Sequence, residues 1–245
     1  MIINRSFKEF KLQHRSKKNQ IIYSSKKVQS DKEVLNLIDN FLIEKNSFIF
    51  ESVEKGKIKG RYTIFGKNPD KIWEFNNNNS FLIKNNKKVK LKEKPQILIE
   101  NIIEDFKFKI PSGLPSIASL ISGYFSYDTI RYIENIPNKC KDDLKVPDVR
   151  LLRPRILVIH DNLKKKIFYI VNIFKDEKIS NYPKKYLGIK SELSKLFTQS
   201  LKAKDKTTNE KKLAKINVKS NTSKNKFLSM VNKAKKYIKI GDIFQ

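Results

Sequence analysis

The chain has 245 residues, of which 39% are hydrophobic and 32% charged, enough for one large domain or two small ones. Its 53 Lys and Arg outnumber its 25 Asp and Glu, but they are spread along the chain without the interleaved aromatic residues of an RNA-binding sheet, so we expect no nucleic-acid partner. A single cysteine, Cys140, excludes an intramolecular disulfide and a CxxC site, and the N-terminus does not have the pattern of a signal peptide. Because no apolar run is long enough to span a membrane, we expect a cytoplasmic protein with no membrane partner.

The first predicted helix covers residues 31–43. Ser30 and Glu33 have the spacing of a capping box, in which each side chain bonds to the backbone N–H of the other residue. Apolar residues then recur every three or four positions, which places them on one face of a helix.

Strand patterns follow this helix. The apolar run 47–53 predicts one strand, and residues 61–66 predict a second strand that Asn68 and Pro69 close. Residues 71–75 and 80–84 flank four consecutive asparagines. Since Asn tolerates left-handed backbone angles, these two segments are predicted to form a hairpin.

The second half of the chain mixes helix and strand patterns. Asp161 and Asn162 separate two β-rich runs and favour a tight turn between them. The predicted elements are a helix from Pro95 that Pro111 ends, a short helix over 128–132, a hairpin of strands 155–160 and 166–173, and a helix over 186–197.

The C-terminal residues indicate a change of domain. Residues 198–224 are polar and are predicted to be a linker between a first domain, residues 1–197, and a second segment, residues 225–245. Apolar residues at helical spacing predict an amphipathic helix in the second segment, with Gly241 as its C-terminal cap. Ile243 and Phe244 are predicted to begin a strand, and since so short a strand needs a partner, we expect a fragment of a longer chain.

Four stretches resemble, in order and at suitable separations, the large subunit of anthranilate synthase, component I, in the family of chorismate-utilising enzymes. They are Phe50 to Val53, Gly60 to Gly66 followed by Pro69, Gly123 to Asp128 with Arg131 and Glu134, and Ala234 to Gln245. The resemblance implies an α+β fold of antiparallel sheets with packed helices. It also implies an N-terminal regulatory domain over residues 1–197 and a chorismate-binding domain that is truncated near its start.

The resemblance also implies a reaction. The family converts chorismate and ammonia to anthranilate and pyruvate in tryptophan biosynthesis. A separate glutaminase subunit, component II, supplies the ammonia, and Mg²⁺ assists the chemistry. In the family the acidic residues that hold Mg²⁺ lie in the C-terminal domain, beyond residue 245 of this chain. The fragment alone is therefore expected to be inactive.

The resemblance also implies roles for three residues, through the positions they occupy in the family's motifs. Glu51 and Ser52 match the family's strand that lines a pocket for tryptophan, the feedback inhibitor, so they are candidate effector contacts. A carboxylate can hold an ammonium group and a hydroxyl can bond to either end of an amino acid. Phe48 and Phe50 depart from the family's leucines and put the shape of that pocket in doubt. Gln245 matches a position where ammonia-using members carry glutamine, and a neutral amide cannot abstract a proton from water.

Two other functions remain open from the residues. Aminodeoxychorismate synthase, the related large subunit of the folate pathway, shares much of the same pattern. A basic nucleic-acid-binding protein is the alternative from another class. His14 and His160 are the only histidines, and His160 is expected to have a structural role at the end of an apolar strand.

Overall fold

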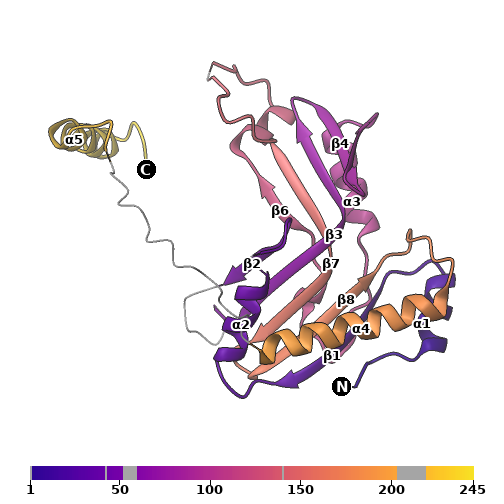
Figure 1. Ribbon diagram of the computed structural model, residues 1–245. Helices are drawn as coiled ribbons and strands as arrows, with labels where there is room; N and C mark the ends of the chain where they lie inside the picture. Colours follow the sequence, from indigo (N-terminus) through magenta and orange to yellow (C-terminus); the bar gives the residue numbers. More distant parts are fainter. Residues whose placement is uncertain (1, 42, 52–59, 140, 203–218) are drawn as a thin grey trace. The chain divides into compact units, whose positions relative to one another are not determined.

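The computed structural model describes the whole chain except residues 1, 42, 52–59, 140 and 203–218 (Figure 1). The chain divides into two units, Met1–Lys204 and Asp205–Gln245. The first unit combines an antiparallel sheet with packed helices, which confirms the predicted α+β class. The described part of the second unit contains one helix, α5 (Lys224–Ile240).

The sheet of the first unit has eight strands among the described residues, in the order β1-β8-β7-β3-β4-β5, with β2 also on β3 and β6 also on β7. Neighbouring strands are antiparallel throughout. The strands are β1 (Gln20–Lys27), β2 (Phe48–Glu51), β3 (Tyr62–Asn76), β4 (Asn79–Lys84), β5 (Lys87–Leu91), β6 (Ser122–Phe125), β7 (Val149–Asp161) and β8 (Lys166–Ile173).

Helices cover one face of this sheet, where α4 runs across the strands in Figure 1. Phe10, Leu37 and Leu193 are fully buried there against Tyr169 of β8, because each helix turns an apolar stripe toward the sheet. The helices of the first unit are α1 (Phe7–Arg15), α2 (Lys32–Phe41), α3 (Pro95–Asp105), α4 (Tyr182–Leu201) and the 3-10 helices η1 (Ser116–Ala118) and η2 (Tyr127–Tyr132).

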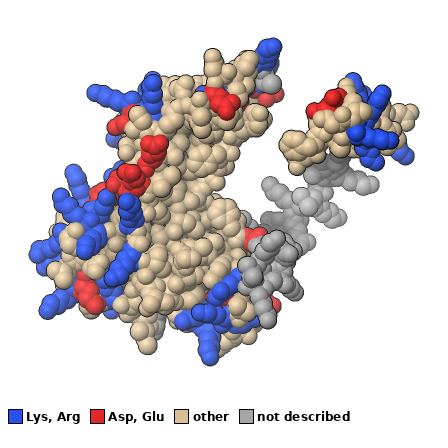
Figure 2. Space-filling model, turned by 180° about the vertical axis from the view of Figure 1, so that it is seen from behind, with Lys and Arg blue, Asp and Glu red and all other residues tan. Residues whose placement is uncertain are grey.

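The opposite face of the sheet is covered by α3 and by the segment that follows it. Ile102 of α3 packs on Trp73 and Val149. Phe108 and Leu120 lie against buried side chains of β1, β7 and β8. Seen from behind, much of the central surface of the first unit carries no charged side chain, and Lys and Arg gather toward its margins (Figure 2). Large apolar side chains that remain exposed include Phe50 and Phe125.

The asparagine hairpin is confirmed. Asn77 and Asn78 have φ of +47° and +62° and join β3 to β4, which is the backbone that a two-residue hairpin turn requires. Asn85 and Asn86 repeat this turn at +50° and +60° and lead into β5, a strand that was not predicted. The pair Asn85 and Asn86 was the signal in the sequence from which β5 could have been predicted.

The predicted end of a strand at Asn68 and Pro69 is wrong. Strand β3 continues through both residues and pairs with β7 on either side of them. The register shifts between Pro69 and Lys71, and Asn68 has φ of +50°, so the strand passes this point through a bulge. Proline is tolerated at a bulge because the missing N–H would have no ladder partner there.

The predicted helices exist, but several of their ends differ. The Glu33 carboxylate accepts a hydrogen bond from the Gln29 N–H at 3.3 Å instead of completing the predicted box with Ser30. Helix α3 ends at Asp105, before Pro111, and α4 runs on to Leu201, so residues 198–201 of the predicted linker are helical. Most of the remaining linker lies outside the described residues.

The C-terminal helix is confirmed together with its cap. Gly241 has φ of +82°, and the N–H groups of Gly241 and Asp242 bond to carbonyl groups of the last turn of α5. Ile243 and Phe244, where a strand was predicted to begin, follow the cap outside any strand of the described residues, and that strand stays a prediction.

Candidate functional site

Glu51, the first of the predicted effector contacts, ends strand β2. It pairs with Thr63 of β3, and Thr63 pairs in turn with His160 of β7. Residues that face each other across neighbouring strands share one face of a sheet. Glu51, Thr63 and His160 therefore form one row across the sheet, which we call the Glu51 row.

The residues of the Glu51 row become less exposed to solvent from the edge of the sheet to the core. Glu51 is exposed, whereas Thr63 and His160 are each only 3% exposed. Within the described part of the chain, no cation lies within 4.0 Å of the Glu51 carboxylate. An exposed carboxylate without a partner can accept hydrogen bonds from an ammonium group. Ser52 lies outside the described residues, so its role stays a prediction.

His160 is buried on β7, and its expected structural role stays a prediction. Burial lowers its pKa, and the nearby Lys165 lowers it further, while Asp31, Asp161 and Glu33 act weakly in the opposite direction. Its Nε2 atom is buried without a hydrogen-bond partner among the described residues. The neutral imidazole is therefore the favoured form in the folded chain.

Phe48 and Phe50 lie on the opposite side of β2 from Glu51, because successive strand residues alternate between faces. Their ring centroids are 4.9 Å apart, and the Phe48 ring lies over Gly66 of β3. A Cβ atom on Gly66 would come within 2.2 Å of that ring, so the glycine makes room for Phe48. The departure from leucine thus changes the far side of the strand, away from the Glu51 carboxylate.

Arg61 and Asp161 join the ends of β3 and β7. The Arg61 guanidinium donates two hydrogen bonds to the Asp161 carboxylate, at 3.1 and 2.8 Å, and Asp161 also accepts from the backbone N–H of Leu163 and Lys164. Burial alone would raise the pKa of Asp161, but the bonds from Arg61 and Lys164 outweigh it and lower that pKa. This pair fixes the turn between β7 and β8 and has a structural role.

Gln245, the predicted nucleophile-selectivity residue, is exposed and lies in the second unit, beyond the cap of α5. Its role stays a prediction. Among the described residues, no group of three His, Cys, Asp or Glu side chains could hold a metal ion. None of the helices that the structure describes is both long and apolar enough to cross a membrane.

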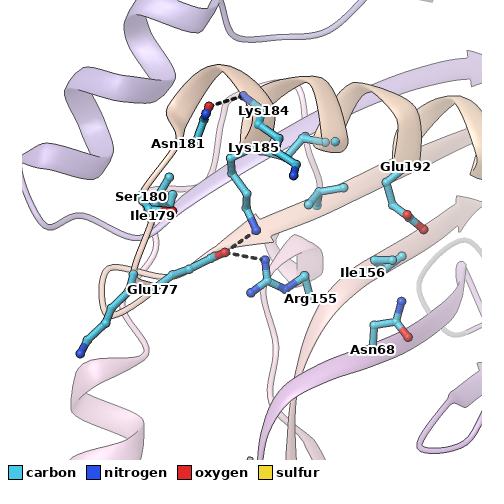
Figure 3. A pocket seen from close by; sticks show the side chains of 14 residues that line it. Asn68, Arg155, Ile156, Glu177, Ile179, Ser180, Asn181, Lys184, Lys185 and Glu192 are labelled. Carbon is cyan, nitrogen blue, oxygen red and sulfur yellow. Dashed lines mark hydrogen bonds and ion pairs between the residues drawn. The ribbon is translucent and has the colours of Figure 1, made fainter. Parts of the chain in front are cut away.

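A pocket of about 550 Å³ lies between α4 and the sheet, and sequence reasoning missed it (Figure 3). We call it the α4 pocket. Arg155 enters it from β7, Glu177 from the connection after β8, and Lys185 from α4. The one available signal was Gly188, an isolated glycine inside the helix predicted over 186–197.

The charges of the α4 pocket meet at Glu177. Its Oε1 atom accepts a hydrogen bond from Nη1 of Arg155 at 3.0 Å and also pairs with Nζ of Lys185 (Figure 3). Burial raises the pKa of Glu177, but the bonds from Arg155 and Lys185 outweigh burial and lower it. The carboxylate is therefore ionised and holds the two cations in place on the pocket wall.

Known proteins match this chain over most of its length. The family described as chorismate binding enzyme matches residues 45–245. Anthranilate synthase component 1 of Acetivibrio thermocellus is 33% identical over 233 residues, which is 92% of this chain and 47% of the relative. The protein of the same name from Cereibacter sphaeroides is 27% identical over 253 residues, which is 98% of this chain and 49% of the relative.

A solved structure shows the same fold. The crystal structure of anthranilate synthase component I from Streptococcus pneumoniae TIGR4 matches with a TM-score of 0.54 and 21% identity, over 81% of this chain and 42% of that chain. The present chain thus spans about half the length of the curated relatives it matches. It fits an N-terminal part of them, as its motifs predicted, and by the match over residues 45–245 the chain belongs to the family of chorismate binding enzymes.

Proposed function

We propose that this chain is the N-terminal part of an anthranilate synthase component I, which converts chorismate and ammonia to anthranilate and pyruvate. The observation that carries the proposal is the alignment of relatives with that name to 92% and 98% of this chain. The family match supports chorismate as the substrate. In this proposal the product enters tryptophan biosynthesis in the cytoplasm.

The proposal assigns the remaining parts of the reaction to groups outside the described residues. Ammonia comes from a glutaminase subunit, component II. In this proposal the acidic ligands of Mg²⁺ belong to the half of the relatives that this chain does not span. The 245 residues by themselves then have no synthase activity.

A fused chain tests the proposed reaction. Residues 1–245 are joined to the second half of the Acetivibrio thermocellus relative and supplied with chorismate, Mg²⁺ and an ammonium salt. We expect anthranilate, detected by its fluorescence and by chromatography, from the fusion and not from either half alone. Anthranilate formed by residues 1–245 alone would contradict the proposed inactivity of this part. A folded fusion without a chorismate product would contradict the proposed function.

The proposed regulation assigns the ammonium group of tryptophan to Glu51 and one end of the amino acid to Ser52. The exposed and unpaired carboxylate of Glu51, next to the buried Thr63, supports this assignment within the described residues. Calorimetric titration of the fused chain with tryptophan tests it. We expect Glu51→Gln to weaken binding by roughly tenfold, because it removes one charge-assisted hydrogen bond.

The matched control is Glu100→Gln on α3, which neutralises another exposed carboxylate and should leave tryptophan binding unchanged. Equal affinities of the wild-type chain and the Glu51→Gln variant would remove Glu51 from the effector site. The alternative from the folate pathway is tested with the chain's own second half in place of the relative's, because the relative's half would dictate the product. Aminodeoxychorismate in place of anthranilate would then identify that alternative. No contact of the described residues favours that alternative, or nucleic-acid binding, over the synthase.

A further inference from the structure

We propose that the α4 pocket binds a small organic carboxylate with an apolar body about the size of one ring. The pocket lies between α4 and strands β7 and β8 (Figure 3). It shares no residue with the Glu51 row and does not include Gln245. The inference therefore stands on separate residues from the proposed function, and each can fail without the other.

Gly188 is the first observation. It lies in the middle of the 20-residue helix α4, where glycine is less favourable than alanine. A Cβ atom added there would meet nothing within 4 Å, and the backbone is not in the left-handed region. Neither packing nor backbone conformation requires glycine at this position. Its effect is to leave the pocket open along the helix.

The second observation is an apolar floor of fixed shape. Ile156 of β7, Val171 of β8 and Ile189 of α4 line the pocket, and each is at most 3% exposed. They belong to the main hydrophobic core, so their positions are set by the packing of three elements. A volume of about 550 Å³ falls within the usual range of small-molecule sites.

The third observation is an excess of positive charge. Arg155, Lys178, Lys184 and Lys185 line the pocket against two carboxylates, Glu177 and Glu192, which leaves a net charge of +2 from four cations and two anions. Within the part of the chain that the structure describes, no carboxylate lies within 4.0 Å of the ammonium groups of Lys178 and Lys184. The pocket is therefore set up to attract an anion.

The guanidinium of Arg155 favours a carboxylate as that anion. Among the described residues its hydrogen bond to Glu177 uses only Nη1, at 3.0 Å, which leaves Nε and Nη2 of the guanidinium for a ligand. Two parallel N–H donors match the two oxygens of a carboxylate. The polar end of the ligand then lies at Arg155 and its apolar body lies over Ile156, below Gly188.

Asn68 closes the far side of the pocket (Figure 3). It has φ of +50° and lies at the bulge that carries β3 past Pro69. Bulges re-aim side chains beside sites. The Asn68 amide can both donate and accept, so it can contact a polar substituent on the ring of the ligand.

The first test compares three probes in calorimetric titrations of the full 245-residue chain. Benzoate carries both the ring and the charge, acetate carries only the charge, and benzyl alcohol carries only the ring. We expect benzoate to bind roughly tenfold or more tightly than either partial probe, because both parts of the pocket contribute. Equal binding of benzoate and a partial probe, or no binding of benzoate, overturns the proposal.

Two variants assign the binding to this pocket. Arg155→Lys keeps the positive charge beside Glu177 but removes the paired donors, and we expect a loss of benzoate affinity of roughly tenfold. Gly188→Leu fills the space left by the glycine and should abolish binding. The matched control Lys190→Gln removes a cation of α4 outside the pocket and should leave the affinity unchanged.

Circular dichroism and thermal melting show whether each variant is folded. If Gly188→Leu does not fold, Gly188→Ala replaces it, since alanine favours the helix and its methyl group still narrows the pocket. Wild-type affinity in folded Arg155→Lys together with wild-type affinity in either Gly188 variant overturns the proposal. None of these titrations contains chorismate or tryptophan, so their failure leaves the proposed synthase function unaffected.

Discussion

At the scale of single residues, His160 shows how a position in the sheet sets the ionisation of a side chain. It is 3% exposed on β7, and burial together with Lys165 lowers its pKa below the ordinary value. Asp31, Asp161 and Glu33 are near enough to oppose this shift but do not reverse it. The unfolded chain therefore takes up a proton at a higher pH than the folded chain does.

This difference predicts a loss of stability on acidification. As the pH falls from about 7.5 through the ordinary histidine pKa of about 6.5, the free energy of unfolding should fall, until the folded chain also becomes protonated. The loss is about 1.4 kcal/mol for each unit by which the folded pKa lies lower. Urea denaturation at several pH values measures it. His160→Asn should show a shallower dependence than wild type, and an unchanged dependence would contradict the prediction.

At the scale of elements, β6 depends on a close approach between two backbones. Gly123 pairs with Leu151 of β7, and a Cβ atom at Gly123 would lie 1.9 Å from the carbonyl oxygen of Arg150. That oxygen belongs to the backbone of a strand paired on both sides, so it cannot move aside cheaply. The glycine is therefore required for β6 to join the sheet.

Gly123→Ala is expected to reduce the free energy of unfolding by about 1–3 kcal/mol, since the added methyl group forces β6 and β7 apart. Urea denaturation gives the magnitude, and hydrogen exchange of the β6 amides shows where the pairing opens. Tyr124→Phe is the matched control on the next residue of β6, which is exposed, and should change stability by less than about 0.5 kcal/mol. Equal stability of Gly123→Ala and wild type would disprove the close approach.

At the scale of the whole molecule, the charge is the dominant feature. The chain carries a formal net charge of +28, and positive side chains lie on both units. Such an excess destabilises a compact state through self-repulsion. Twelve ion pairs among the described residues, including Arg61 with Asp161 and Arg155 with Glu177, use carboxylates near the sheet and leave most lysines unmatched.

Salt should therefore stabilise this chain. Raising NaCl from about 0.1 M to about 1 M shortens the screening length from about 10 Å to about 3 Å and weakens the repulsion between lysines. We expect the melting temperature to rise by about 2–4 °C for each kcal/mol of repulsion removed. Scanning calorimetry measures this shift, with an uncharged osmolyte at equal osmolality as the control. A melting temperature that stays constant or falls with salt would show that repulsion between the positive side chains does not limit stability.

Local patterns in the sequence were sufficient for many elements. The asparagine pair at Asn77 and Asn78, the amphipathic spacing of α5 and its glycine cap at Gly241 involve neighbours in the chain, so they could be predicted without a fold. In each of these cases the physical cause lies within a few residues. The antiparallel α+β class and the family came instead from the resemblance of short motifs to known enzymes.

Contacts between distant segments decided the rest. Strand β3 passes through Asn68 and Pro69 because β7, more than eighty residues later, pairs with it on both sides of the bulge and outweighs the local breaking signal. The Glu51 row and the α4 pocket likewise join residues from strands and helices far apart in the sequence. The sequence by itself determined most local elements and carried the resemblance that indicated the family, whereas the effector role of Glu51 stays a prediction. The tertiary structure alone showed that Thr63 and His160 lie in one row with Glu51 and that Gly188 opens a charged pocket, because strand register and helix packing determine which side chains meet.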